Sequence, residues 1–500
     1  MISLIVSINK YYIGIKMEGT VKKRFFSGIV WTFIQNVALK VIGFVFTILL
    51  TRLLSPSDYG LIGMLAIFIA ISEVFILSGF GDALVQKKNC TDEDFSTAFY
   101  FNVAIAGIIY TILFFSAPLI AKFYHEPQLI ILTRVLALNF VLGSLNIVQQ
   151  AKLTKAMNFK PLAILALICM IVGGIVGVTM AYLGFGVWAL VAQTLSSTSL
   201  RVVLFPFFTK WHPNRPFNKE SFGQLWHYGS RLLVTGMIGV IIRNISSILI
   251  GRFYNKEQVG YFTRAQSLAA IPSESLFSVL SSVTFPALCE YQDDHDRWLG
   301  VYRRVLFNTV LIVCPFIVLL ALLSEPLVII LFTDKWAACI PLLQALLLAR
   351  MFLPIGATHT SLLRSAGDTT LYMKLYFITG PISLIAVAIS IPFGVVAMAW
   401  ATLAGALIAY LVPAYVIGRK FGYTLKEQLW DWRKIFLSLI VMSVAVWFSN
   451  NWIGVMWQKL IVGGIVGVVS YYICCIFFRL IDDDLKSLII NKLRINDNKL

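Results

Sequence analysis

Two stretches of this sequence repeat each other: ILLTRLLSPSDYGLIGM at residues 48–64 and ILIGRFYNKEQVGYFTR at residues 248–264. Arg252 lies 200 positions after Arg52, and Gly260 lies 200 positions after Gly60. Each stretch ends one apolar segment, crosses a polar loop and enters the next apolar segment. The general preference for apolar residues in membrane segments cannot explain identical residues inside a polar loop. The match therefore predicts that the chain contains an internal repeat.

A second pair of stretches supports the same repeat. FGVWALVAQTL begins at Phe185, and FGVVAMAWATL begins 208 positions later at Phe393. If both pairs are equivalent, the first and sixth apolar segments recur as the seventh and twelfth. Because six is even, both halves enter the membrane from the same side, and the repeat is parallel, with its pseudo-two-fold axis along the membrane normal.

The composition excludes a water-soluble protein. Of the 500 residues, 59% are hydrophobic and 13% are charged, and the mean hydropathy is +0.83. A soluble chain needs more polar residues than this to cover its surface. The solvent of this chain is therefore lipid, and a span of the hydrocarbon core takes about 20 apolar residues.

Fourteen apolar runs are separated by polar residues, glycine or proline. They cover residues 28–54, 60–84, 95–124, 129–152, 160–183, 186–209, 222–250, 259–288, 301–323, 338–363, 372–391, 394–418, 433–449 and 453–478. Helices satisfy their own backbone in lipid, and these runs lack the alternation of barrel strands. We predict an all-α integral membrane protein with about 14 transmembrane helices. The predicted parts are a cytosolic N-terminal segment (1–27), an N-lobe (28–220) and a C-lobe (221–420) of six helices each, and two extra C-terminal helices with a tail (421–500).

The lysines and arginines predict the orientation. The terminal segments and the loops on their side hold 28 of them, whereas the opposite loops hold six. Cytosolic loops carry the excess of positive charge in membrane proteins. We therefore expect both termini in the cytosol, and the net charge of +17 reports topology rather than nucleic-acid binding.

The repeat lies in a chain that resembles a known family. The block GIVWTFIQNVALKVIGFVFTILLTRLLSPSDYGLIGM (residues 28–64), SGFGDALVQKK (78–88) and the stretch from Phe185 are similar to the Wzx-like lipopolysaccharide and polysaccharide flippases of the multidrug/oligosaccharidyl-lipid/polysaccharide exporter superfamily. The resemblance covers residues 20 to about 480. It implies two six-helix lobes around a central cavity in the bacterial inner membrane, which move an undecaprenyl-diphosphate-linked oligosaccharide from the cytosolic to the periplasmic leaflet. It also implies a glycan polymerase and glycosyltransferases of the same pathway as partners, and no cofactor.

Charged residues inside the apolar runs are candidates for function, because a charge at mid-bilayer costs at least about 2.5–3.5 kcal/mol. The cations are Lys40, Arg134, Arg201, Arg231, Arg243, Arg264 and Arg350. The anions are Glu73, Asp82 and Glu274. An interior with more cations than anions favours an anionic guest such as a lipid diphosphate.

The candidates for the diphosphate site can be ranked by their depth in the membrane, which follows from the position of each charge in its apolar run. Lys40 and Arg243 fall near the middle of the first helix of each lobe, so they are the first candidates for the diphosphate site. Arg264, Arg350 and Arg134 follow. Each could instead form a structural ion pair, for example Arg264 with Glu274, or extend to the headgroups.

The carboxylates suggest coupling and gating. Glu73 and Glu274 occupy nearly equivalent positions of the two halves, and a carboxylate in the membrane could take up a proton and couple transport to a gradient. A static ion pair is the alternative role. Asp82 follows Gly79 and Gly81 at the cytosolic end of the second run, where we expect a gating contact.

Two other functions remain open at this point. A cation-coupled multidrug antiporter is expected to carry acidic residues for cationic guests, and this interior is mainly basic. A membrane glycan polymerase or ligase is expected to have a large outer loop with catalytic residues, and the outer loops here are short. Motifs for ATP, zinc proteases and serine hydrolases are absent from the sequence, and Asp294-x-Asp296 is a weak metal motif in a short loop. We therefore expect a transporter rather than an enzyme.

Overall fold

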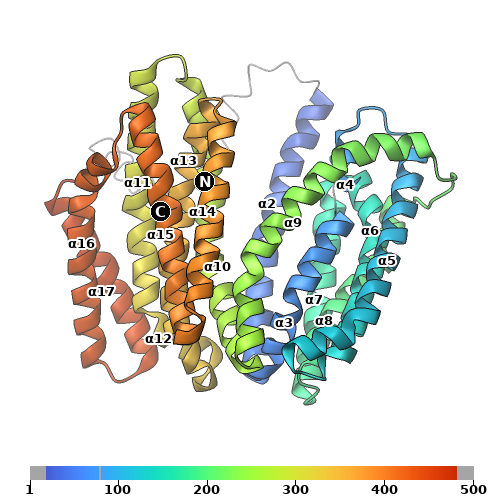
Figure 1. Ribbon diagram of the computed structural model, residues 1–500, viewed down its shortest axis with the longest axis horizontal. Helices are drawn as coiled ribbons and strands as arrows, with labels where there is room; N and C mark the ends of the chain where they lie inside the picture. Colours follow the sequence, from blue (N-terminus) through green and yellow to red (C-terminus); the bar gives the residue numbers. More distant parts are fainter. Residues whose placement is uncertain (1–18, 78–79, 481–500) are drawn as a thin grey trace, which may run out of the picture. The chain divides into compact units, whose positions relative to one another are not determined.

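Helices make up the described part of the chain (Figure 1), which confirms the predicted all-α class. The computed structural model describes residues 19–77 and 80–480. Inside these ranges, the side chains of residues 19–30, of most residues between 227 and 243, and of a few others lie outside the described set. The side chains of two predicted functional residues, Asp82 and Arg243, lie outside the described set.

The first half of the chain forms helices α2 to α9, of which α5 begins with a side-chain cap. Their bounds are α2 Gly19–Leu53, α3 Pro56–Leu77, α4 Phe80–Gln86, α5 Asp92–Tyr124, α6 Leu129–Lys155, α7 Phe159–Tyr182, α8 Trp188–Thr209 and α9 Lys219–Phe253. At the start of α5, the Thr91 hydroxyl accepts from the Asp94 backbone N–H (3.3 Å), and the Asp94 carboxylate accepts from the Thr91 N–H (3.0 Å). This reciprocal pair is a capping box, which satisfies amides that a helix start leaves open.

The second half continues in the same way. Its helices are α10 Lys256–Glu290, α11 His295–Leu322, α12 Ser324–Phe332, α13 Ile340–Ser365, α14 Thr369–Ile389, α15 Val395–Phe421, α16 Leu425–Trp452 and α17 Met456–Phe477, with short 3-10 turns η2 Asp334–Cys339 and η3 Ile391–Phe393. Asp294 caps α11 by accepting from the Arg297 N–H (3.2 Å). The first aspartate of the Asp294-x-Asp296 motif thus has a structural role.

Thirteen helices within the described residues are long and apolar enough to cross a membrane. They correspond to all the predicted runs except 222–250, which falls in the 35-residue helix α9, where many side chains lie outside the described set. The described part of the run 60–84 lies in α3 and the short α4. The structure differs from the prediction at the short helix α12, which stands between the predicted runs 301–323 and 338–363.

The chain divides into two compact units. Unit 1 holds residues 1–55 and 65–244, and unit 2 holds residues 56–64 and 245–500. The first turns of α3 therefore belong with unit 2, although the rest of α3 belongs with unit 1. The lobe boundary predicted at residue 220 is not tested by this division, and it stays a prediction.

The two copies of the repeated sequence meet inside unit 2, through their glycines. A Cβ atom added to Gly60 would lie 1.7 Å from the carbonyl oxygen of Lys256, and one added to Gly260 would lie 1.9 Å from the carbonyl oxygen of Pro56. Since Lys256 is the repeat equivalent of Pro56, these two contacts are equivalent. Helices α3 and α10 therefore cross at this point at backbone contact, which only glycine permits.

Two further pairs of glycines, Gly173/Gly177 and Gly463/Gly467, form GxxxG motifs, which are typical of close helix packing. A Cβ atom on Gly173 of α7 would lie 2.8 Å from the carbonyl oxygen of Gln193 in α8. On α17, a Cβ atom on Gly467 would lie 2.4 Å from the Leu319 side chain of α11. The GxxxG motifs thus mark places where helices pack within each unit.

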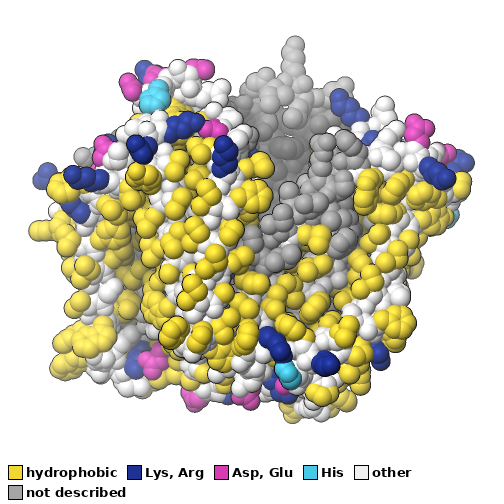
Figure 2. All heavy atoms as spheres, in the orientation of Figure 1, with side chains coloured by type: hydrophobic (Ala, Val, Ile, Leu, Met, Phe, Trp, Pro, Cys, Tyr) yellow, Lys and Arg dark blue, Asp and Glu magenta, His cyan; other side chains and the backbone are white. Residues whose placement is uncertain are grey.

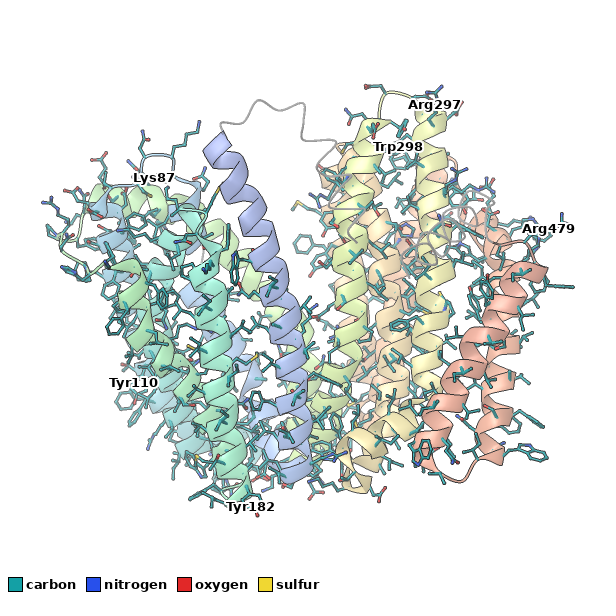
Figure 3. All side chains as sticks on the ribbon, turned by 180° about the vertical axis from the view of Figure 1, so that it is seen from behind. Lys87, Tyr110, Tyr182, Arg297, Trp298 and Arg479 are labelled. Carbon is teal, nitrogen blue, oxygen red and sulfur yellow. The ribbon has the colours of Figure 1, made fainter. Side chains whose placement is uncertain are left out.

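Basic side chains gather at one end of unit 2 (Figure 2), the end at which Arg297 and Trp298 lie (Figure 3). Several of them hold neighbouring helices together there. Arg303 of α11 binds both carboxylate oxygens of Asp431 in α16, at 2.8 and 2.9 Å. The Lys420 ammonium of α15 donates to Asp368, which caps the start of α14, and lowers the pKa of that carboxyl. Asp368 also accepts from the Leu371 N–H (3.0 Å).

Candidate functional site

An ion pair lies inside unit 2 near the middle of two long helices. Arg350 of α13 donates from Nη1 to Glu274 Oε1 of α10 at 3.3 Å. The Arg350 side chain is 24% exposed and the Glu274 side chain is 65% exposed. The pair joins a predicted substrate cation to a predicted coupling carboxylate. Because Glu274 keeps most of its surface open, the pair is accessible to a ligand or a proton.

Arg264 does not pair with Glu274, which was the structural alternative expected from sequence. Its guanidinium lies over the ring of Tyr59, 3.9 Å from the centroid. Tyr59 is buried and also contacts Trp336 edge-on, with 5.6 Å between the ring centroids. Arg264 lies in the third turn of α10, near the crossing of Gly60 and Gly260. Arginine stacks on aromatic faces through its planar guanidinium, so Tyr59 helps to hold the Arg264 side chain in place.

Arg134 is held by the neighbouring helix. Its Nε atom donates to the carbonyl oxygen of Phe114 in α5 at 3.3 Å, and its guanidinium lies 4.3 Å from the centroid of the Phe114 ring. Arg134 is in the second turn of α6, close to the end of that helix. This geometry gives Arg134 a role in packing α5 against α6.

The other candidates in unit 1 are more open. Lys40 is exposed on α2, beside the exposed Val37 and Val41. Glu73 is exposed on α3. The structure therefore brings together one pair of the predicted residues, Arg350 with Glu274, and it places Lys40 and Glu73 on open helix faces.

Unit 2 contains a buried polar cluster that was not predicted from the sequence. The hydroxyl of Tyr302 in α11 is hydrogen-bonded to Nδ1 of His359 in α13 at 2.6 Å, and both side chains are almost fully buried. The His359 ring also stacks on Tyr410 of α15, with 4.9 Å between centroids. The Tyr410 hydroxyl donates to Oε1 of Gln428 in α16 at 2.7 Å. This cluster joins four helices through polar contacts that lipid cannot replace.

Unit 1 contains a second polar feature that sequence reasoning missed. Asn146 and Gln149 of α6 are buried, and their side-chain oxygens have no hydrogen-bond partner among the described residues. The same holds for the amide nitrogen of Asn102 in α5. The signal was present in the sequence, because uncharged polar residues are also uncommon within long apolar runs. Only charged residues were considered as candidates.

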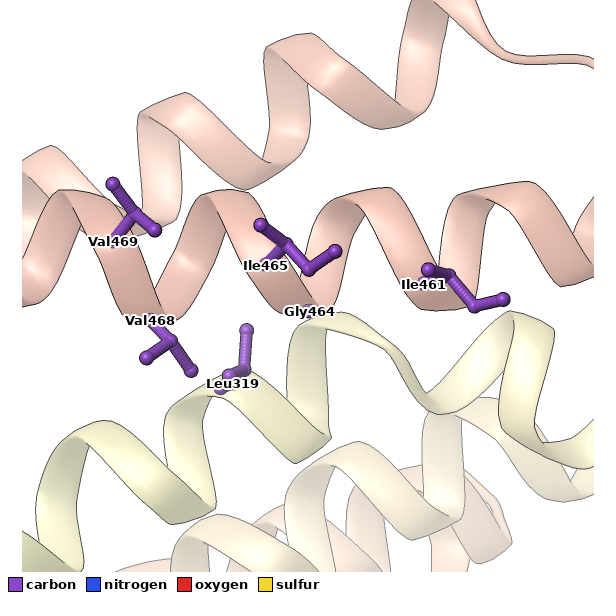
Figure 4. Close-up of a pocket in the computed structure, with 6 residues that line it drawn as sticks. All are labelled: Leu319, Ile461, Gly464, Ile465, Val468 and Val469. Atoms are coloured by element: carbon purple, nitrogen blue, oxygen red, sulfur yellow. The ribbon is translucent and has the colours of Figure 1, made fainter. Parts of the chain in front are cut away.

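A groove between α11 and α17 has a lining of apolar residues only (Figure 4). It is lined by Leu319, Ile461, Gly464, Ile465, Val468 and Val469. All these side chains are apolar, so the groove suits hydrocarbon chains of any lipid. It offers nothing to select a head group.

Comparison with known proteins relates the whole chain to polysaccharide transport. The teichuronic acid biosynthesis protein TuaB of Bacillus subtilis (strain 168) is 22% identical over 430 residues, covering 85% of this chain and 89% of the relative. The succinoglycan biosynthesis transport protein ExoT of Rhizobium meliloti (strain 1021) is 24% identical, with 88% and 90% covered. The lipopolysaccharide biosynthesis protein WzxC of Escherichia coli (strain K12) is 22% identical, with 71% and 73% covered.

Solved structures show the same fold. The inward closed conformation of the lipid II flippase MurJ matches with a TM-score of 0.71 at 17% identity, covering 91% of this chain and 99% of that one. An inward-facing multidrug resistance MATE family transporter of the MOP superfamily matches with a TM-score of 0.59 at 16% identity, covering 83% and 99%. The fold is thus the one shared by these two groups of transporters.

These comparisons confirm the resemblance found in the sequence and make the chain a multi-pass membrane transport protein of polysaccharide biosynthesis rather than an enzyme. The family model described as "polysaccharide biosynthesis protein" matches residues 49–341, more than half of the chain. The chain belongs to this polysaccharide biosynthesis protein family.

Proposed function

We propose that this protein is a flippase that moves an undecaprenyl-diphosphate-linked oligosaccharide from the cytosolic to the periplasmic leaflet by alternating access. The observation that carries the proposal is similarity over most of the chain to TuaB, ExoT and WzxC, in a chain that has the fold of a lipid II flippase. The product serves the synthesis of lipopolysaccharide, O-antigen or exopolysaccharide. A glycan polymerase and glycosyltransferases of the same pathway are the expected partners.

The intramembrane cations are proposed to bind the diphosphate. Lys40, Arg243, Arg264 and Arg350 are the main candidates, and Arg134 is a weaker one because it is engaged with Phe114. Guanidinium groups match phosphate oxygens in bidentate geometry, and an ammonium acts as a point charge. The tail of the substrate remains in the bilayer while its head group crosses.

The Arg350–Glu274 pair supports a specific step within this proposal. Without substrate, Glu274 neutralises Arg350 at a contact of 3.3 Å. A diphosphate competes with the carboxylate for the guanidinium, and a proton taken up by Glu274 removes that competitor. Glu73 is proposed to act in the same way in the first half of the chain, and Asp82 is proposed to act in gating.

The proposed orientation has both termini in the cytosol of a bacterial cell, in the inner membrane. The bias of 28 lysines and arginines to six supports it. In unit 1, Lys87 and Tyr182 lie at opposite ends of the helices (Figure 3), as expected for a cytosolic and a periplasmic loop.

The second candidate function is cation-coupled multidrug antiport, which the structural likeness to a MATE family transporter favours. The charge balance opposes it, because the intramembrane candidates are seven cations and three anions. Cationic drugs need acidic partners, whereas diphosphates need basic ones.

Depletion of the protein in its host cell separates the two functions. The flippase proposal predicts that lipid-linked oligosaccharide accumulates and that the surface polysaccharide disappears. Sensitivity to cationic drugs with unchanged lipid-linked oligosaccharide would instead support antiport and overturn the flippase proposal.

A further inference from the structure

Helix α16 carries an outward-facing basic site that the transport proposal does not use. The helix has 28 residues and is therefore about 42 Å long, whereas the hydrocarbon core is about 30 Å thick. Charged residues are confined to its first ten positions, which end at Arg433 and Lys434, and the segment 435–448 holds none. The boundary between headgroups and hydrocarbon thus falls next to these two cations.

A groove of about 570 Å³ begins at this boundary. Arg433 and Lys434 line one end of it, and the rest is apolar, including Leu437 and Ile440 of α16 and Phe478 beyond the end of α17. Leu437 and Ile440 are 50% and 59% exposed, so they face the surroundings rather than the core of unit 2. The groove therefore has a cationic end at headgroup depth and an apolar end below it.

The two cations are free of ion pairs with carboxylates in the part of the chain that the structure describes. The Arg433 guanidinium lies over the Trp430 ring at 3.9 Å and donates to the Trp430 carbonyl oxygen at 2.6 Å. The Lys434 ammonium donates to the Phe478 carbonyl oxygen at 3.2 Å. Each cation keeps donor capacity for an anion, because guanidinium has five N–H groups and ammonium has three.

Asp431 of the same helix is engaged by another partner. Both of its carboxylate oxygens bind Arg303 of α11, and it accepts from the Tyr423 hydroxyl at 2.7 Å. The Asp431 side chain is 19% exposed, whereas Arg433 and Lys434 are exposed. The two cations thus present positive charge at the groove, which complements an anion.

We propose that this groove binds an anionic phospholipid. Its phosphate lies between the Arg433 guanidinium and the Lys434 ammonium, and one acyl chain runs along Leu437 and Ile440. A lipid is favoured over a soluble partner because the apolar part of the groove lies below the headgroups, where a soluble protein cannot reach. The indole of Trp430, at headgroup depth, completes the site as an interfacial anchor.

The test titrates the purified full-length protein with phosphatidylglycerol or phosphatidylcholine and counts bound lipids by native mass spectrometry. The wild type is expected to retain one tightly bound phosphatidylglycerol and no equivalent phosphatidylcholine. The double variant Arg433→Gln/Lys434→Gln is expected to raise the Kd of that lipid by about tenfold or more. Arg433→Lys, which keeps the charge, is expected to retain most of the affinity.

The matched control is Arg419→Gln/Lys426→Gln, which removes two exposed cations from the same end of unit 2 but outside the groove. It is expected to bind phosphatidylglycerol as the wild type does. Unchanged binding in the Arg433/Lys434 variant, or an equal loss in the control, would overturn the proposal. Equal melting temperatures of the variants show that a loss of binding is not a loss of fold.

Discussion

At the scale of single residues, the arrangement of charge inside the membrane links structure to function most directly. Arg350 and Glu274 come from different helices and meet at 3.3 Å, with the carboxylate still largely open. A buried static pair is closed to competitors, whereas this one can exchange its partner. Arg264 makes a different kind of contact, because its guanidinium stacks on the ring of Tyr59.

Arg350→Gln is expected to lower transport of the lipid-linked oligosaccharide by about tenfold or more, since a charge-assisted hydrogen bond contributes about 1.5–3 kcal/mol. The measurement is leaflet exchange in reconstituted vesicles. Arg364→Gln, on the same helix at the basic end, is the matched control and is expected to transport normally. The double variant Arg350→Gln/Glu274→Gln separates the two roles. It stays inactive if Arg350 binds the diphosphate, and it recovers if Arg350 only neutralises Glu274.

Tyr302→Phe is expected to lower the free energy of unfolding by about 1–3 kcal/mol, because it leaves Nδ1 of the buried His359 without its partner. The measurement is thermal or denaturant unfolding of the purified protein in detergent. Tyr472→Phe on α17 is the control, because that tyrosine is 53% exposed. An equal change in both variants would contradict a structural role for the Tyr302–His359 pair.

At the scale of helices, the crossing of α3 and α10 explains why the repeated sequence contains its glycines. Gly60 and Gly260 each face a backbone carbonyl of the other copy, at a distance that leaves no room for a Cβ atom. Backbone atoms cannot move aside as a flexible side chain can. This contact fixes the first turns of α3 to unit 2, and the remainder of α3 continues into unit 1.

Gly60→Ala and Gly260→Ala are each expected to lower the free energy of unfolding by about 1–3 kcal/mol, as overpacking does. Both are also expected to lower transport. Gly356→Ala in α13 is the control, because a Cβ atom there has open space within 4 Å. In that helix interior alanine is favoured over glycine by about 1 kcal/mol, so the control is expected to be neutral or stabilising. If the unfolding curves of the three variants coincide, this account of the crossing is contradicted.

Much of the fold could be predicted because lipid leaves the backbone few choices. Each of the fourteen apolar runs corresponds to a long helix, since a run of that length must satisfy its own hydrogen bonds in the membrane. The short α12 was missed, because its nine residues are too few to mark a separate transmembrane run by hydropathy. At the candidate site, sequence identified the rare charges. It could not pair Arg350 with Glu274, because periodicity gives the depth of a residue but not the neighbour that its side chain faces.

At the scale of the whole molecule, the distribution of charge separates three roles. Cations at the helix ends support the proposed orientation, Arg433 and Lys434 on α16 are proposed to bind the surrounding lipid, and the few charges at mid-membrane are proposed to handle the substrate. The fold and family establish a polysaccharide transport protein. The mid-membrane cations are the reason to propose a diphosphate-linked cargo.

The most direct measurement is leaflet exchange of a fluorescent undecaprenyl-diphosphate oligosaccharide in vesicles that contain the purified protein. The account predicts faster exchange than in empty vesicles under a suitable proton or ion gradient. It also predicts that exchange falls to the empty-vesicle rate with Arg350→Gln and is retained with Arg364→Gln. If vesicles with the wild-type protein exchange the lipid no faster than empty vesicles under every gradient, the proposed function is contradicted.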